Sequence, residues 1–600
     1  MRRIVELHGT GVIHSYSPEA TRSGMTGRRS SAMTTTWPTG MPRTLDYPDG
    51  TIADLLAGSA HAYPDRAALI DGDERLTYAE LYERALRVAQ GLRDQGIAPG
   101  DAVAVHMPNS IWFTVGYYGI LFAGASVVPV NPAQPPIALR RQLDDSGTVA
   151  VLTHPSVAAQ LAEGIAGSET VRLVSVAPPT AAAPAPGGDR APVTFPVPTV
   201  AFDDLMKAEA APPTAVEGDA IAHLAFTGGT TGVPKAVMVL HRNLVKNVLQ
   251  VACWRSAAVP AADEEGRITL SHVGEARTEH HIPIGSATGI SIAPLFHGMG
   301  MVSQSVFAAA GLTMVVFGRF DPVRYLDTVE HLCVHAITGS PALCHALLAV
   351  PGVRERDLSC VRLVSSGSAP INPAATAELA NVFPRAIVSD GYGLTEATMG
   401  VSISPLDSAM PRPTGSTGLA LFDTEIEIRD MDGVTPMARG EKGEVWVRGP
   451  QITAGYLGHP ELTAGQYVDG WLRTGDLGTY DEQGWLSLVG RAKDMLIYKG
   501  YNVYPGPLEN ILREHPAVAQ ASVVGRPHPE HGEIPLAFVS LKSEAGGVDS
   551  AATAEELMAY VAERVAPYQR IRDVVIVDEL PLSATGKILK TELRRRAAGS

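Results

Sequence analysis

The sequence predicts an α/β protein with a large N-terminal domain of βα units, mostly parallel sheets, and a small α+β domain at its C-terminal end. Three observations predict this. Six hundred residues exceed what one hydrophobic core usually supports. Helical and β-rich runs alternate from Thr51 onward, which is typical of parallel sheets. Beyond about residue 492, shorter β-rich and helical runs mix. We therefore expect a leader over 1–45, a large domain over 46–492 and a lid over 493–600.

The leader is rich in Arg, Ser and Thr and shows little apolar periodicity. Such a stretch cannot bury enough apolar surface to offset its ordering entropy, so we expect it to be disordered. It has no apolar run long enough for a secretory signal. A transit peptide is a second interpretation, and Met33 is an alternative initiator.

The large domain begins with Leu76–Gly96, an amphipathic helix that Gly96 ends, followed by the strand DAVAVHMP. No Asp, Glu, Lys or Arg lies between Asp101 and Arg140, and 111–130 is long enough to span a membrane. Gly124 and Pro129 interrupt it, so we expect a buried helix over about 110–123 and then a buried strand. We interpret 299–318 in the same way.

Two later segments are expected to be irregular. Residues 177–200 are rich in Pro and Ala and predict a surface loop. Residues 254–291 form an unusually long segment with three histidines, and the adjacency of His280 and His281 argues against a shared metal site. The four cysteines have no metal-ligand or disulfide spacing, so we expect free thiols in a reducing cytosol.

The net charge of −15 argues against a nucleic-acid partner, so any site for an anionic ligand must supply its own positive charge. We expect a cytoplasmic protein without a transmembrane segment. The sequence leaves the oligomeric state open.

The stretch FTGGTTGVPKAV, residues 226–237, predicts a phosphate-binding loop. Glycines let backbone N–H groups approach an anion, and hydroxyls and an ammonium add donors. Lys235 follows Pro234, so this is not the Walker pattern. The candidate ligands are Thr227, Gly228, Gly229, Thr230, Thr231, Gly232 and Lys235. An apolar strand should precede the loop, and the next helix should begin only after His241.

Four more motifs follow in order: DGYGLTEAT (390–398), WLRTGDLG (471–478), GWLSLVGRAKDMLIYKGYNVYP (484–505) and PLSATGKILK (581–590). Together with the first, they resemble the adenylate-forming superfamily, which includes acyl-CoA synthetases, peptide-synthetase adenylation domains and firefly-type luciferases. The resemblance covers about residues 45–595. It implies a carboxylic acid, ATP and Mg²⁺ as reactants, CoA as second substrate, and a mobile lid.

The resemblance also implies roles for single residues. Lys587 would bridge the acid and the α-phosphate, Thr395 would contact a phosphate, and Glu396 would hold Mg²⁺, a cation that prefers carboxylate oxygen. Asp476 would bind the ribose hydroxyls with help from Arg491. The adenine side would consist of Gly367, Ser368, Ala369, Asp390, Gly391, Tyr392 and Gly393.

Lys493 lies where the family has its hinge. Rotation there would bring Gly500 and Tyr501 to the site to line a pantetheine tunnel. His297, in FHGMG, would face the acid. The residues of the motifs most resemble those of ligases of medium- and long-chain fatty acids. The alternatives are an acyl-AMP or aryl-acid ligase that loads a carrier protein, and a nucleotide- or acyl-binding protein without catalysis.

Overall fold

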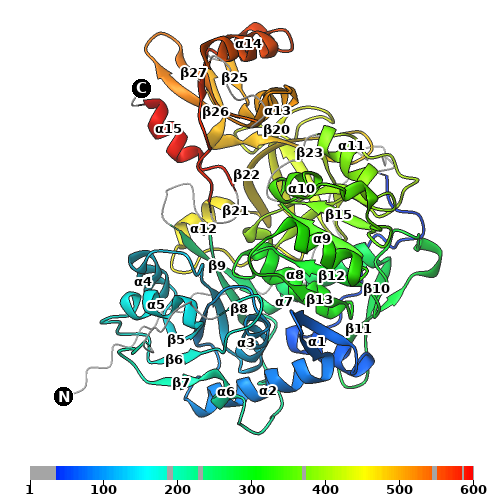
Figure 1. The fold of residues 1–600 in the computed structure, drawn as a ribbon, viewed down its shortest axis with the longest axis vertical. Helices are drawn as coiled ribbons and strands as arrows, with labels where there is room; N and C mark the ends of the chain where they lie inside the picture. Colours follow the sequence, from blue (N-terminus) through cyan, green and yellow to red (C-terminus); the bar gives the residue numbers. More distant parts are fainter. Residues whose placement is uncertain are drawn as a thin grey trace, which may run out of the picture.

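The computed structural model describes residues 36–184, 193–227, 234–367, 373–499, 501–542, 550–583 and 587–598. Figure 1 shows a large body with a small lid of C-terminal residues above it. The predicted α/β class, with a large N-terminal domain and a small α+β lid, is confirmed.

The first sheet of the body has seven strands in the order β7-β6-β5-β3-β4-β8-β9, all parallel except β9. Its strands are β3 (Ala102–His106), β4 (Ser126–Pro129), β5 (Thr148–Thr153), β6 (Leu173–Val176), β7 (Thr199–Ala201), β8 (Ile221–Thr227) and β9 (Lys235–Leu240). The helices interspersed with these strands in the chain are α3 (Ile111–Phe122), α4 (Pro136–Asp145), α5 (Ala158–Gly164) and α6 (Phe202–Leu205).

The uncharged stretch therefore folds as predicted, into α3 and then β4. Every residue of both elements is buried, because α3 packs inside the body. In the described part of the chain, no helix has the length and apolarity that a membrane span requires.

The second sheet has fourteen strands, and it is parallel through β1, β13, β12, β14, β15 and β16 and antiparallel elsewhere. The parallel strands are β1 (Ala67–Asp71), β12 (Thr288–Ser291), β13 (Thr313–Val316), β14 (Ala336–Gly339), β15 (Leu363–Ser366) and β16 (Ile387–Gly393). The antiparallel strands are β2 (Glu74–Thr77), β17 (Gly400–Ile403), β18 (Ser416–Ala420), β19 (Glu425–Arg429), β20 (Gly443–Arg448), β21 (Tyr467–Val468), β22 (Trp471–Tyr480) and β23 (Leu486–Arg491).

The remaining body helices are α1 (Ile52–Ala62), α2 (Tyr78–Asp94), α7 (His241–Ser256), α8 (Gly298–Ala309), α9 (Pro322–His331), α10 (Pro341–Leu348), α11 (Pro373–Val382) and α12 (Pro460–Gln466). The second apolar stretch, residues 299–318, folds into helix α8 and strand β13, as predicted. The long 254–291 segment contains a two-stranded hairpin, β10 (Ala258–Ala262) and β11 (Ile268–His272). Its three histidines bond to protein oxygens, and no group of three metal-ligating side chains occurs among the described residues.

The described residues begin about ten residues before the expected end of the leader. Trp37 packs edge-on against Trp254, with ring centroids 5.1 Å apart, and Met41 and Leu45 are buried. The expectation of disorder is thus wrong for 36–45, because these apolar side chains have a surface on α7 to cover. Residues 1–35 lie outside the described chain.

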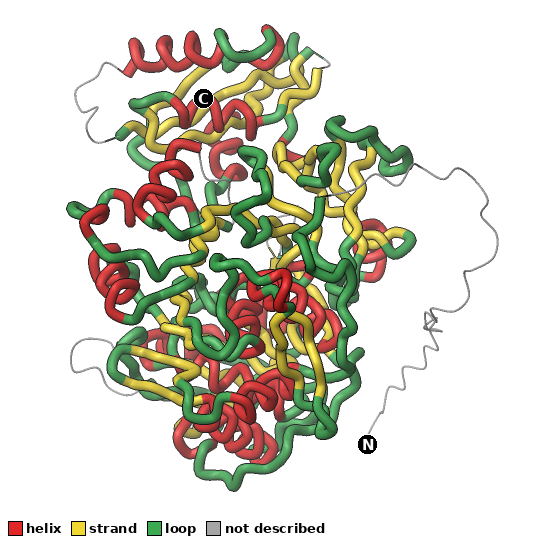
Figure 2. The backbone as a smooth tube through the Cα atoms, turned by 90° about the vertical axis from the view of Figure 1, so that its right-hand side faces the viewer, coloured by secondary structure: helices red, strands yellow, loops and turns green. Residues whose placement is uncertain are grey.

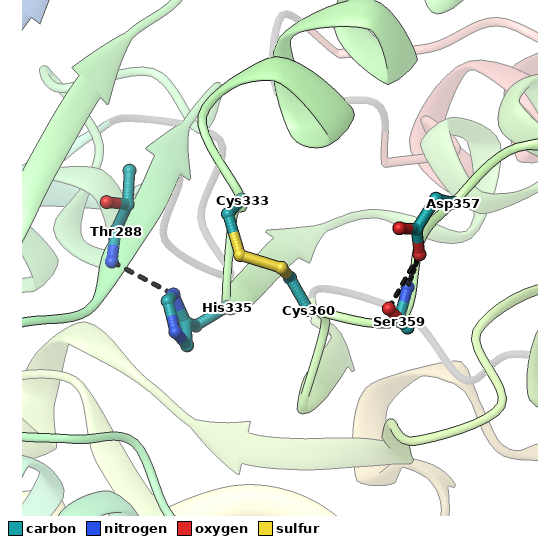
Figure 3. The surroundings of a disulfide bond; sticks show 6 residues. All are labelled: Thr288, Cys333, His335, Asp357, Ser359 and Cys360. Carbon is teal, nitrogen blue, oxygen red and sulfur yellow. Dashed lines mark hydrogen bonds between the residues drawn. A yellow bond between two sulfur atoms is a disulfide. The ribbon is translucent and has the colours of Figure 1, made fainter.

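The expectation of four free thiols is also wrong. Cys333 and Cys360 form a disulfide (Figure 3), with Cα atoms 5.3 Å apart. Cys253 and Cys344 are free and buried. The bridge joins the turns that lead into β14 and β15. Twenty-seven residues separate the two cysteines, so only the parallel pairing of those strands brings them together.

The lid contains a five-stranded sheet, which in Figure 2 lies between helices. Its strands are β24 (Leu496–Tyr498), β25 (Tyr501–Val503), β26 (Val518–His528), β27 (Gly532–Leu541) and β28 (Asp573–Ile576). Its helices are α13 (Pro505–Glu514), α14 (Ser550–Ala562) and α15 (Lys590–Ala598).

Candidate active site

A buried carboxylate lies at the junction of β22, β23 and β16. Asp476 and Arg491 face each other across the β22–β23 pair, and Asp476 Oδ1 accepts from Arg491 Nε at 2.8 Å. Its other oxygen accepts from the Tyr392 hydroxyl at 2.7 Å. Burial raises the pKa of Asp476, whereas Arg491 and Tyr392 act to lower it; Asp476 in turn raises the pKa of Arg491. The three predicted residues thus form one network whose oxygens could accept a cis-diol.

A second carboxylate lies in the 3₁₀ turn after β16. Glu396 Oε1 accepts from the Tyr456 hydroxyl at 2.8 Å, and its main-chain oxygen accepts from the Thr453 hydroxyl at 2.9 Å. Both partners lie about sixty residues later in the chain, and no local signal in the sequence points to them. Thr395 precedes Glu396 in the same turn, so the two predicted ligands lie side by side.

The carboxylate of Glu396 could bind Mg²⁺ only together with further ligands that the substrates or water supply. Within the described chain no three acidic, histidine or cysteine side chains gather around a common point. Mg²⁺ usually combines one or two carboxylates with substrate phosphates and water, which one carboxylate beside a phosphate loop would allow.

The predicted phosphate loop connects two antiparallel strands. Thr227 ends β8, Lys235 begins β9, and the two residues pair across the hairpin. Helix α7 then starts at His241, one residue earlier than predicted. The predicted loop therefore connects two antiparallel strands and does not lead directly into a helix. Its predicted ligands Gly228, Gly229, Thr230, Thr231 and Gly232 lie outside the described residues.

The predicted adenine side follows the carboxyl ends of β15 and β16, where Ser366 pairs with Asp390. Gly393 must be glycine, because a Cβ there would meet Met399 O at 1.6 Å. The Ser366 hydroxyl is buried and has no hydrogen-bond partner among the described residues, so a bound nucleotide could engage it. Gly367 and Gly391 lie at the same edge, whereas Ser368 and Ala369 are outside the described chain.

Lys587 reaches this edge from the lid. Its pKa is lowered, first by the surrounding protein and then by Arg491, while Asp476 and Glu396 oppose that shift. Lys587 also helps to lower the pKa of His297 to about 4, although burial is the larger cause. One lysine thus acts electrostatically on groups from β22, β23, the 395–397 turn and the start of α8.

His297 immediately precedes α8 and is neutral at physiological pH because of that low pKa. Gly298 follows it, and a Cβ there would lie 3.8 Å from the Thr395 hydroxyl. The acid-binding position predicted for His297 is therefore close to Thr395, a predicted phosphate contact.

The predicted hinge lies in a 3₁₀ turn, Ala492–Asp494, between β23 and β24. The last helix holds this turn, because Arg594 donates to Lys493 O at 3.2 Å and to Asp494 Oδ1 at 2.6 Å. Tyr501, the first residue of β25, lies beyond the predicted hinge in the chain and is exposed on the lid, where β25 is near the top of Figure 1. Gly500 lies outside the described residues.

Two carboxylates, Asp476 and Glu396, thus lie at the edge where the family motifs meet, and Lys587 of the lid acts electrostatically on both. The chain belongs to the family of AMP-binding enzymes. The family model "AMP-binding enzyme" matches residues 56–457, and "AMP-binding enzyme C-terminal domain" matches residues 507–587.

Similar proteins are CoA ligases of different acids. The chain is 33% identical to 4-coumarate–CoA ligase 5 of Oryza sativa subsp. japonica, over 89% of this chain and 92% of that protein. It is 31% identical to a long-chain-fatty-acid–CoA ligase of Bacillus subtilis (strain 168), over 93% and 96%. The ATP-bound crystal structure of MatB from Rhodopseudomonas palustris is similar with a TM-score of 0.76 and 27% identity, over 91% and 98%. These relatives support AMP-forming acid–CoA ligase as the enzyme class.

Proposed function

We propose that the protein activates a straight-chain fatty acid with ATP, forming acyl-AMP and pyrophosphate, and then transfers the acyl group to CoA. The observation that carries this proposal is the electrostatic coupling of Lys587 to Asp476, Glu396 and His297, on the segment that follows the Ala492–Asp494 turn. The rice and Bacillus relatives, both named as CoA ligases, support the same two half-reactions.

The chemistry requires the acid's carboxylate to attack the α-phosphorus while the bond to pyrophosphate breaks. Negative charge then grows on the oxygens around phosphorus, and fixed positive groups lower the barrier. Lys587 would neutralise the acid and the α-phosphate, and Lys235 with Thr227 the departing phosphates. Asp476 would hold the ribose in line. When bound at Glu396, Mg²⁺ would add positive charge on the phosphates.

The described side chains near His297 favour an apolar acid. Met299 on α8 lies against Gly367, where a Cβ would stand 3.1 Å from its sulfur. Ser303, one turn later, directs its hydroxyl to Met399 Sδ at 3.8 Å. Two flexible thioethers and neutral His297 suit an alkyl chain, whose burial contributes about 0.8 kcal/mol per methylene.

An aryl acid is the second candidate, and Ser303 is the observation that favours it. A hydroxyl that faces only a thioether makes a weak bond and could instead bind a ring hydroxyl. The plant relative is named for 4-coumarate.

ATP–pyrophosphate exchange with a panel of acids tests the proposal. For fatty acids, kcat/KM should rise by up to about fourfold per methylene until the pocket is full. Ser303→Ala should leave this series unchanged. The enzyme could instead prefer hydroxylated aryl acids strongly and lose that preference in Ser303→Ala. That outcome would support the second candidate, an aryl-acid ligase. If the thioester forms on a carrier protein and never on CoA, CoA is not the acyl acceptor and that part of the proposal is wrong.

A further inference from the structure

The Cys333–Cys360 disulfide lies at the surface of the body, outside the candidate active site (Figure 3). Cys333 is exposed and Cys360 is half-buried, each in the turn that leads into a strand. Thiol–disulfide exchange begins when a thiolate attacks one sulfur, so a bridge at the surface is one that a reductant can open. In the cytoplasm that we expect for this chain, disulfides are usually transient or redox-sensing. The pair is therefore a candidate for reversible modification.

The other two cysteines do not compete in this exchange. Cys253 and Cys344 are buried, and burial raises the pKa of both thiols, that of Cys344 to about 12. A thiol attacks as its thiolate, so both groups are unreactive at physiological pH. The sequence has four cysteines in all, so reduction of the bridge leaves only two reactive thiols, and within the chain these re-form the same bridge.

Main-chain hydrogen bonds hold the two turns in place independently of the bridge. The N–H of Cys333 donates to Glu330 O at 3.3 Å. The main-chain oxygen of His335 accepts from the N–H groups of Arg362 and Leu363 at 2.9 and 3.1 Å, which joins the entry of β14 to the entry of β15. The two thiols should therefore stay close together after reduction, so that the bridge can close again.

The bridge joins the amino ends of two strands whose carboxyl ends belong to the predicted adenine side. Strands β14 and β15 pair in parallel from Ala336 and Leu363 to Gly339 and Ser366. Just beyond this pairing, the N–H of Gly367 donates to Gly339 O at 2.9 Å. A cross-link at one end of so short a strand pair opposes local opening of the whole pair. The bridge should therefore stabilise the edge at which we expect the nucleotide to bind.

We propose that Cys333 and Cys360 form a reversible redox site that stiffens the nucleotide edge when it is oxidised. To open it, a thiolate of a dithiol reductant would attack Cys333 Sγ, the S–S bond would break, and Cys360 would leave as a thiolate and take up a proton. The second thiol of the reductant would then displace Cys333, which gives two cysteine thiols and one reductant disulfide, a transfer of two electrons. A low-molecular-weight disulfide such as oxidised glutathione would close the bridge by the reverse exchange.

Alkylation of the folded full-length protein tests the redox site. The protein is equilibrated with dithiothreitol, labelled with iodoacetamide and analysed by peptide mass spectrometry. We expect labels on Cys333 and Cys360 alone, and we expect these labels to be lost when oxidised glutathione is added before labelling. A bridge that dithiothreitol leaves intact in the folded protein would overturn the inference, and so would labels on Cys253 or Cys344.

The melting temperature and pyrophosphate exchange test the effect on the nucleotide edge, which rests on the proposed function. Reduction should lower the melting temperature by about 5 °C. It should also raise the KM for ATP by about fivefold, the lower end of coupling between two sites. Cys333→Ser with Cys360→Ser should show both effects without reductant and respond to neither reagent. A lowered melting temperature with an unchanged KM for ATP would indicate a purely structural bridge and overturn the inference.

Cys344→Ala is the matched control, because it removes a cysteine and leaves the bridge in place. It should respond to dithiothreitol and oxidised glutathione as the wild type does, and a lost response would overturn the assignment to Cys333 and Cys360. Absence of pyrophosphate exchange with every acid, in both redox states, would instead reject the proposed function. The labelling and melting experiments would still decide whether the redox site exists.

Discussion

The body and the lid hold their charged groups in contrasting ways. Asp476 in the body is 5% exposed, and its oxygens accept from Arg491 and Tyr392. Lys587 belongs to the lid, and among the described residues its main chain bonds to Ser583, which lies in the same segment. Groups that need no reorganisation stabilise a transition state best, so the body provides the fixed field. If the lid rotates at Lys493, as we propose, the charge of Lys587 is one that the rotation would withdraw.

Removal of the Lys587 charge from the lid should have the largest effect on catalysis. Lys587→Ala should lower acyl-adenylate formation by about 100-fold or more, the scale for one lost transition-state partner. Pyrophosphate exchange measures this step. Thioester formation from supplied acyl-adenylate should persist. Lys590→Ala, which removes a lid lysine paired with Glu509, is the control. Exchange near wild-type rates in Lys587→Ala would disprove the role of Lys587.

Blocking the hinge should separate the two half-reactions. Lys493→Pro fixes φ and should hinder rotation, so CoA consumption should fall by about tenfold, a barrier increase of about 1.4 kcal/mol, while pyrophosphate exchange survives. Lys493→Ala removes the ammonium without restricting the backbone and should behave like wild type. If Lys493→Pro slows both half-reactions equally, domain alternation is not the reason for the hinge.

A lower pH should reduce the free energy of unfolding of the body. Burial lowers the pKa of His106 and His241 to about 4 and that of His223 to about 3. The unfolded chain therefore binds more protons below about pH 6.5, the ordinary histidine value, and the free energy of unfolding should fall on acidification toward pH 4. Each histidine contributes up to about 1.4 kcal/mol per pH unit in that window.

Urea unfolding followed by tryptophan fluorescence measures this effect in the body alone, because all six tryptophans precede residue 492. His223→Gln should make the pH dependence shallower. A free energy of unfolding that stays level from pH 6.5 to 4 would contradict the assignment.

The smallest effect should come from residues 1–32. A chain that starts at Met33 should keep its activity and melting temperature, whereas one that starts at Asp46 loses Trp37, Met41 and Leu45 and should melt lower. Differential scanning calorimetry distinguishes the two. A drop of several degrees in the first chain would show that the leader docks on the body.

The sequence predicted the elements and motifs but not their contacts. Asp476 and Arg491 were each assigned to the ribose because of their motifs, yet their ion pair depends on the β22–β23 register. Tyr456 supports Glu396 from sixty residues away, and the Cys333–Cys360 bridge depends on β14 pairing with β15. Such contacts join distant segments, and no local periodicity encodes them.

The hydrogen bonds from Arg594 to the predicted hinge turn matter for how the protein is tagged. Helix α15 ends only a few residues after this contact, so an affinity tag, immobilisation handle or fluorescent fusion added after Ser600 would be tethered close to the pivot. A fusion before Met33 avoids that interference. Labels for following lid motion are therefore better placed on α14 than at the carboxyl terminus.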